Sequence, residues 1–62
     1  MNPYEELKKR LQACVDSPNK DASMCDANSI LREISYATDL EIDQIKNLME
    51  LYYSVKRKVI TI

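Results

Sequence analysis

Apolar residues recur at intervals of three and four near the start of the chain, as on one face of an α-helix. This stripe consists of Tyr4, Leu7, Leu11 and then Cys14 or Val15. Asn2 suits the N-cap and Pro3 the first helical position, while the Ser-Pro-Asn sequence after Asp16 is a stop signal. The pattern predicts a helix that ends near Asp16.

Residues 16–26 (DSPNKDASMCD) are mostly polar and predict a connection, with Met24 and Cys25 turned inward as its anchor. A second, short helix is predicted from about Ala27 to Ala37, with Asp26 as its N-cap. Its apolar positions are Ile30, Leu31, Ile34 and Ala37. A break is expected around residues 38–40.

The third predicted helix runs from about Leu40 or Glu41 to about Lys58 and is apolar over an unusually wide arc. The arc contains Ile42, Ile45, Leu48, Met49, Leu51, Tyr52, Tyr53 and Val55. These residues cover about 200°, whereas a helix packed on one side needs only somewhat more than about 100°. The excess indicates burial against a second copy as well, so we expect a homodimer. The β-branched residues 59–62 favour a short extended tail.

Together these elements predict an all-α fold, a three-helix domain with a long C-terminal helix and a short extended C-terminal tail. Residues 1–62 form one domain, because 62 residues are too few for two cores. Such a short chain buries only about 60% of its unfolded surface, which also favours association.

The composition argues against catalysis. The chain has no Gly for a phosphate-binding loop and no His for general-base chemistry or metal binding, so we expect no enzyme, cofactor, metal or small-molecule substrate. A net charge of −1 gives no bulk attraction to nucleic acid or to a membrane. No apolar run resembles a signal peptide or a membrane span, so a cytoplasmic location is expected.

Cys14 and Cys25 are the only cysteines. We interpret them as reduced thiols that act as small apolar residues. A disulfide that joins the end of the first helix to the following segment is the alternative.

The segment from Leu31 to Leu51 resembles the helix-turn-helix superfamily of DNA-binding proteins. Ile34 falls at the buried position of the first helix, Ser35 where a small residue lets the helices approach, and Asp39 at the turn position usually held by Gly. The remaining apolar positions of the motif are occupied by Leu40, Ile42, Ile45 and Leu48.

The resemblance implies a small homodimeric transcription regulator, of the kind found as bacterial, plasmid or phage accessory proteins. Its major-groove residues would be Gln44, Lys46 and Asn47. Its phosphate contacts would be Lys56, Arg57 and Lys58.

The alternative is a small helical protein–protein interaction module, an adaptor or inhibitor. On this interpretation the acidic residues Glu41, Asp43 and Glu50, which would repel DNA, face a partner protein. Tyr53 lies at the edge of the apolar arc and would place its ring on that partner.

Overall fold

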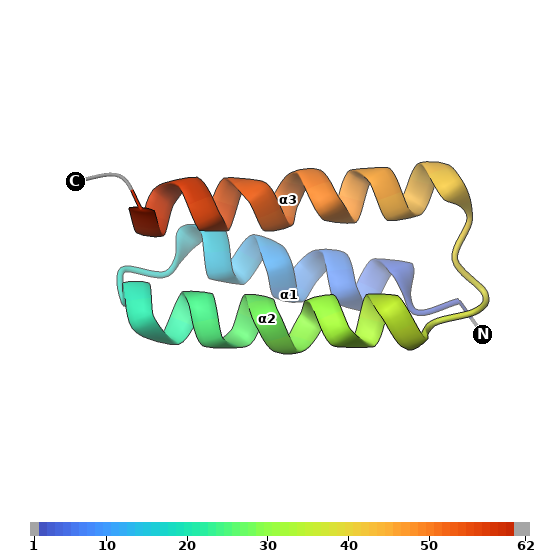
Figure 1. Cartoon of the computed structure of the whole chain (residues 1–62), viewed down its shortest axis with the longest axis horizontal. Coiled ribbons are helices and arrows are strands. Elements are labelled where there is room, and N and C mark those ends of the chain that lie inside the picture. Colours follow the sequence, from blue (N-terminus) through green and yellow to red (C-terminus); the bar gives the residue numbers. More distant parts are fainter. Residues whose placement is uncertain (1, 61–62) are drawn as a thin grey trace.

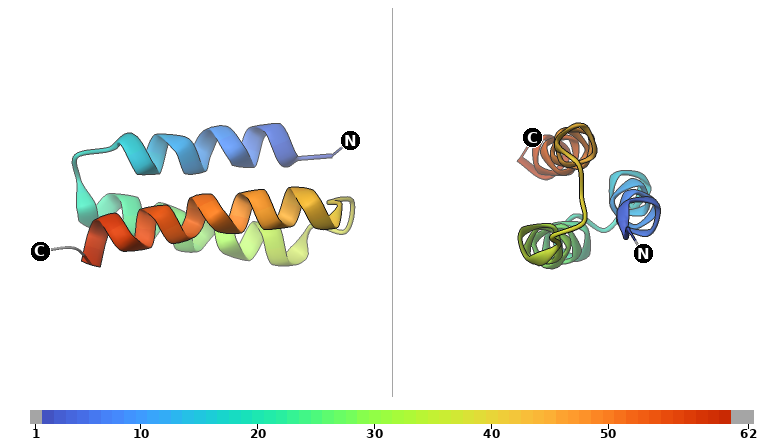
Figure 2. Two further views of the ribbon diagram at one scale, coloured as in Figure 1. Left: turned by 90° about the horizontal axis from the view of Figure 1, so that it is seen from above. Right: turned by 90° about the vertical axis from the view of Figure 1, so that its right-hand side faces the viewer.

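The computed structural model describes residues 2–60, which form three helices. These are α1 (Tyr4–Asp16), α2 (Lys20–Tyr36) and α3 (Ile42–Ile60). Consecutive helices run antiparallel, and the end-on view of Figure 2 shows them at the corners of a triangle (Figures 1 and 2). Each helix packs against both of the others. The predicted all-α domain of three helices with a long C-terminal helix is therefore confirmed.

A single narrow core runs along the axis of the bundle, and each helix contributes one row of side chains to it. Its buried apolar members are Leu7, Leu11, Cys14, Ala27, Ile30, Ile34, Leu48, Tyr52 and Val55. The rows on α1 and α3 follow the three-and-four spacing seen in the sequence. The predicted apolar stripe of α1 thus faces the core, whereas on α3 only part of the predicted arc does, and its members Ile42 and Tyr53 are exposed.

α2 begins seven residues earlier than predicted, at Lys20 instead of Ala27. Its N-cap is Asn19, whose side-chain oxygen accepts a hydrogen bond from the Ala22 N–H at 3.0 Å. Asp26, the predicted cap, lies inside the helix. The prediction of a polar connection over residues 16–26 is therefore wrong for all but its first few residues.

The early start of α2 was missed because small residues form its inward row. Ser23 and Ala27 are buried, with 1% and 0% of their surface exposed, and they let α2 lie close to its neighbours. A search for large apolar residues does not detect such a row. Met24 packs against the core as expected. Cys25 is exposed, because the next residue along a helix points about 100° away.

The ends of α1 and α3 also differ slightly from the expectation. α1 starts at Tyr4, and its N-cap is Pro3 instead of Asn2. Asn2 lies one residue before the cap, and its side-chain oxygen accepts a hydrogen bond from the Tyr4 N–H at 2.8 Å. At the other end of the chain, Val59 and Ile60 continue α3 instead of forming an extended tail. The last two residues of the predicted tail, 61 and 62, lie outside the described residues.

The position of the N-cap of α2 can be tested by a pair of substitutions. We expect Asn19→Ala to destabilise the protein by about 1 kcal/mol, because the Ala22 N–H loses its acceptor. Asp26→Ala, the matched control, should change stability by no more than about 0.5 kcal/mol. Urea unfolding followed by circular dichroism measures both. A larger loss for Asp26→Ala than for Asn19→Ala would contradict the observed start of the helix.

Candidate interaction surface on α3

The side chain of Gln44, the first predicted base-reading residue, is hydrogen-bonded within the chain at the start of α3. Its side-chain oxygen accepts hydrogen bonds from the Glu41 backbone N–H at 3.1 Å and from Asn2 Nδ2 at 2.7 Å. Asn2 Nδ2 also donates to the Asp39 carbonyl at 3.0 Å. Gln44 thereby satisfies an N–H at the helix terminus and helps to fix the N-terminal segment against the turn before α3.

Asn47 and Lys46 lie on different sides of α3. Asn47 Nδ2 donates to the Tyr4 hydroxyl at 3.4 Å, so Asn47 faces the N-terminal end of α1. Lys46 is exposed. The three residues predicted to read bases therefore do not form one outward row.

Lys58, one of the three predicted phosphate contacts, instead closes the carboxyl end of α1. Its Nζ donates to the carbonyls of Cys14 at 2.8 Å and Val15 at 2.9 Å, and also to the Ser17 carbonyl. These carbonyls belong to the last turn of α1 and the residue after it, where a helix leaves acceptors without intrahelical donors. The three N–H groups of the ammonium suit this arrangement. Lys56 and Arg57, its neighbours in sequence, are exposed.

The arrangement of α2 and α3 also differs from a helix-turn-helix motif. Helices in that motif cross at about 90–120°, whereas α2 and α3 lie side by side and antiparallel (Figures 1 and 2). The Gly that usually holds the turn position of the motif permits a left-handed backbone conformation. Asp39 does not adopt this conformation, because no residue from 2 to 60 has a positive φ. This geometry does not favour the DNA-binding interpretation.

The residues of the alternative interpretation are all accessible. Glu41, Asp43 and Glu50 are exposed, and Tyr53 retains 50% of its surface. Asp43 and Glu50 are seven residues apart and so share one side of α3. Glu41 instead lies before the first turn, where its carbonyl accepts from the Ile45 N–H at 2.9 Å. Two of the three acids thus belong to one helix face.

An apolar row follows the outer side of α3 along its whole length. Ile42 and Ile60 are 77% and 63% exposed, Tyr53 is half exposed, and Met49 is partly buried. Lys46 and Lys56 complete a regular alternation of four- and three-residue steps. We call this row the outer stripe: Ile42, Lys46, Met49, Tyr53, Lys56 and Ile60. Sequence analysis placed Ile42, Met49 and Tyr53 in the apolar arc but missed Ile60, because it was assigned to an extended tail.

The C-terminal half of the outer stripe contains a shallow hollow, lined by Tyr53, Lys56, Arg57 and Ile60. The Tyr53 ring packs edge-to-face on Tyr52, with ring centres 5.8 Å apart. Tyr52 is itself held by a hydrogen bond of 3.0 Å from its hydroxyl to Asn28 Oδ1 on α2. One wall of the hollow is therefore fixed by the bundle.

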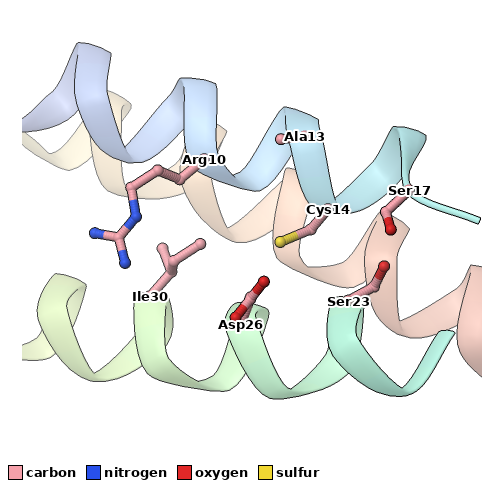
Figure 3. A pocket seen from close by; sticks show the side chains of 7 residues that line it. All are labelled: Arg10, Ala13, Cys14, Ser17, Ser23, Asp26 and Ile30. Carbon is pink, nitrogen blue, oxygen red and sulfur yellow. The ribbon is translucent and has the colours of Figure 1, made fainter. Parts of the chain in front are cut away.

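A second hollow lies between α1 and α2 (Figure 3). It is lined by Arg10, Ala13, Cys14, Ser17, Ser23, Asp26 and Ile30. Arg10 reaches Glu33 on α2 in an ion pair of 2.7 Å, and the buried Ser23 hydroxyl has no hydrogen-bond partner among the described residues. Figure 3 shows the Ser17 and Ser23 hydroxyls turned toward the same gap.

The chemistry of this second hollow does not indicate a reactive site. Cys14 is buried and Cys25 is exposed, and no disulfide joins them in the structure. Burial, and next the nearby Asp26 carboxylate, raise the pKa of the Cys14 thiol, against smaller opposing effects of Lys58 and Arg10. Because the thiolate is the nucleophile, a raised pKa makes Cys14 less reactive. Within residues 2–60, no group of three or more Cys, Asp or Glu side chains could hold a metal ion.

Comparison with known protein families, with curated proteins and with solved structures finds no match to this chain. Over the described part of the chain, none of the helices combines the length and apolar character that a membrane crossing requires. The function has to be inferred from the chain's own surface, and the outer stripe of α3 is its most distinctive feature.

The structural role of Lys58 gives a direct prediction. We expect Lys58→Met to destabilise the protein by about 1–3 kcal/mol, because the methionine keeps the aliphatic stem but removes the donors to the end of α1. Lys9→Met, the matched control at an exposed position of α1, should stay within about 0.5 kcal/mol of the wild type. Urea unfolding gives both values. Equal stability of the two variants would show that Lys58 does not close α1.

Proposed function

We propose that this chain is a small helical interaction module, which binds a partner polypeptide along the outer stripe of α3. The supporting observation is the exposure of Ile42, Tyr53 and Ile60 in one row with Met49. Isolated exposed apolar residues are normal on a protein surface. An aligned row along a whole helix is typical of surfaces that bind another protein.

The residues beside the apolar row support the same function. Asp43, Lys46, Glu50 and Arg57 follow one edge of the row. Protein interfaces commonly combine an apolar centre, often with tyrosine, and a polar rim that remains accessible to solvent. The rim contributes orientation and specificity more than affinity.

A DNA-binding function has less support. Gln44, Asn47 and Lys58, three of the six predicted DNA contacts, make hydrogen bonds within the chain. The exposed carboxylates of Asp43 and Glu50 share the outer side of α3 with Lys46, where they would repel phosphates.

The proposed function can be tested by site-specific photo-crosslinking in cells of the source organism. A photoreactive phenylalanine analogue at position 53 should form covalent adducts, because the outer stripe contacts the partner. The same analogue at position 29, an exposed site on α2, should give few or none. Mass spectrometry identifies the partner and distinguishes a second copy of the chain from another protein. Equal labelling at both positions, or none at position 53, would contradict the proposal.

A band-shift titration with mixed-sequence duplexes tests the DNA-binding interpretation. We expect no shift even at low salt, because the cations that remain exposed on α3 are interspersed with carboxylates. A shift that weakens steeply with added salt, and that Lys46→Ala and Lys56→Ala both reduce, would favour DNA binding instead.

A further inference from the structure

We infer that the partner is a second copy of this chain, bound antiparallel so that the outer stripes of the two α3 helices pack together. In this dimer, Ile42 of each copy inserts into the hollow between Tyr53 and Ile60 of the other. The inference rests on the proposed function and specifies its partner.

The shape of the stripe suits a second copy of the same helix. The hollow is formed by residues 53, 56, 57 and 60, at positions i, i+3, i+4 and i+7 of one helix. Four residues at these positions form the hole that accepts one side chain when two helices pack knobs-into-holes. Ile42, 77% exposed, is the branched apolar side chain on the same stripe that such a hole accepts. One helix therefore carries both a knob and a hole.

A single register of the two helices serves the whole stripe. In an antiparallel pair, residues that lie opposite each other have numbers with a constant sum. The centre of the hollow lies between residues 56 and 57. If Ile42 lies opposite this centre, the sum is 98 (42 and 56) or 99 (42 and 57). The same sum places Met49 opposite the partner's Met49. There, residues 46, 49, 50 and 53 form a second hole of the same spacing. The contact is thus self-complementary about a two-fold axis at Met49.

Charges follow the stripe in a regular order. Asp43, Glu50 and Arg57 lie on one flank of α3 and, together with Lys46 at the adjacent side of the stripe, alternate in sign along the chain. When two helices pack antiparallel, equivalent flanks face each other. Asp43 then lies near the partner's Arg57, and Lys46 near the partner's Glu50. The numbers of these pairs add up to 100 and 96, which are close to the sum of 98 or 99 for residues directly opposite each other. The two Glu50 carboxylates, whose sum is also 100, approach each other across the two-fold axis, and each has a Lys46 beside it. The flank thus contributes four contacts between opposite charges and one between like charges.

A parallel pair does not have this complementarity. In a parallel pair, opposite flanks of the two helices face each other. The flank that contains the alternating charges would then face the partner's other flank, which contains Lys56 and Ile45. The charge order therefore selects the antiparallel dimer, as flanking charges do in coiled coils.

The contact is also small. α3 is 19 residues long, which corresponds to about 28 Å. A contact between two single helices of this length lies at the low end of stable interface sizes. We therefore expect a dimer that dissociates in the micromolar range.

Sedimentation equilibrium of the purified chain over a range of concentrations tests the association. We expect the mass to rise with concentration from 7.2 kDa toward twice that value. Ile42→Asp should leave the chain monomeric, because it places a carboxylate in the partner's apolar hollow. Ser29→Asp, which adds the same charge at an exposed site on α2, should dimerise like the wild type. Circular dichroism verifies that both variants remain folded.

Disulfide trapping tests the orientation. In a Cys25→Ser background, with Cys14 buried, Ile42→Cys and Lys56→Cys are prepared as separate variants. Under mild oxidation, a mixture of the two should form a mixed disulfide, because positions 42 and 56 lie opposite each other. Neither variant alone should form disulfide dimers at a comparable rate. Rapid dimer formation by each single variant would indicate parallel packing and overturn the inference.

The remaining outcomes separate this inference from the proposed function. A chain that stays monomeric at every concentration, but that forms adducts with another protein from position 53, overturns the dimer and leaves the interaction module in place. A dimer that Ile42→Asp does not weaken uses another face, which also overturns the inference. A monomer without adducts at position 53 overturns both.

Discussion

One narrow row of side chains on each helix has to hold this bundle together, and the rest of the structure depends on that constraint. Three antiparallel helices enclose an axis only one residue wide, so each helix can bury a single stripe. On α3 this stripe includes Leu48, Tyr52 and Val55, none more than 8% exposed. Ile45, Met49, Leu51 and Val59 pack against the edges of the core, whereas Ile42, Tyr53 and Ile60 remain exposed outside it. The outer stripe is therefore surplus to the fold of one chain, and this surplus is what suggests a function.

The same constraint explains why polar groups are used at the ends of the helices. A core this thin cannot enclose the helix termini, so their backbone groups need partners from elsewhere in the chain. Asn19 supplies one at the start of α2, Gln44 another at the start of α3, and Lys58 closes α1 from the opposite end of the sequence. Within residues 2–60, the side chains of the outer stripe make no hydrogen bonds of this kind to the rest of the bundle. The stripe is therefore suited to recognition.

Much of the fold could be predicted from local spacing, and much of the candidate site could not. The rows of α1 and α3 follow from large apolar residues at helical intervals, and the wide arc on α3 extends beyond its row to Ile42 and Tyr53, which the structure leaves exposed. The first part of α2 escaped detection because Ser23 and Ala27 are too small to mark a stripe. Lys58 was assigned to DNA because nothing local to it reveals its partners, the carbonyls of Cys14, Val15 and Ser17, which are at least 41 residues away in the chain. Gln44 also accepts from the nearby Glu41 N–H, but its other partner, Asn2, is 42 residues away.

By itself the sequence determined three helices, their inward faces and the absence of the residues that most catalysts need. These properties depend on side-chain type and on periodicities of three and four residues, which are local. Only the tertiary structure decided which polar side chains are occupied within the bundle and which remain available. Whether a lysine caps a helix or faces solvent depends on how neighbouring helices pack. That packing sets distances between residues far apart in the chain, which local sequence patterns do not contain.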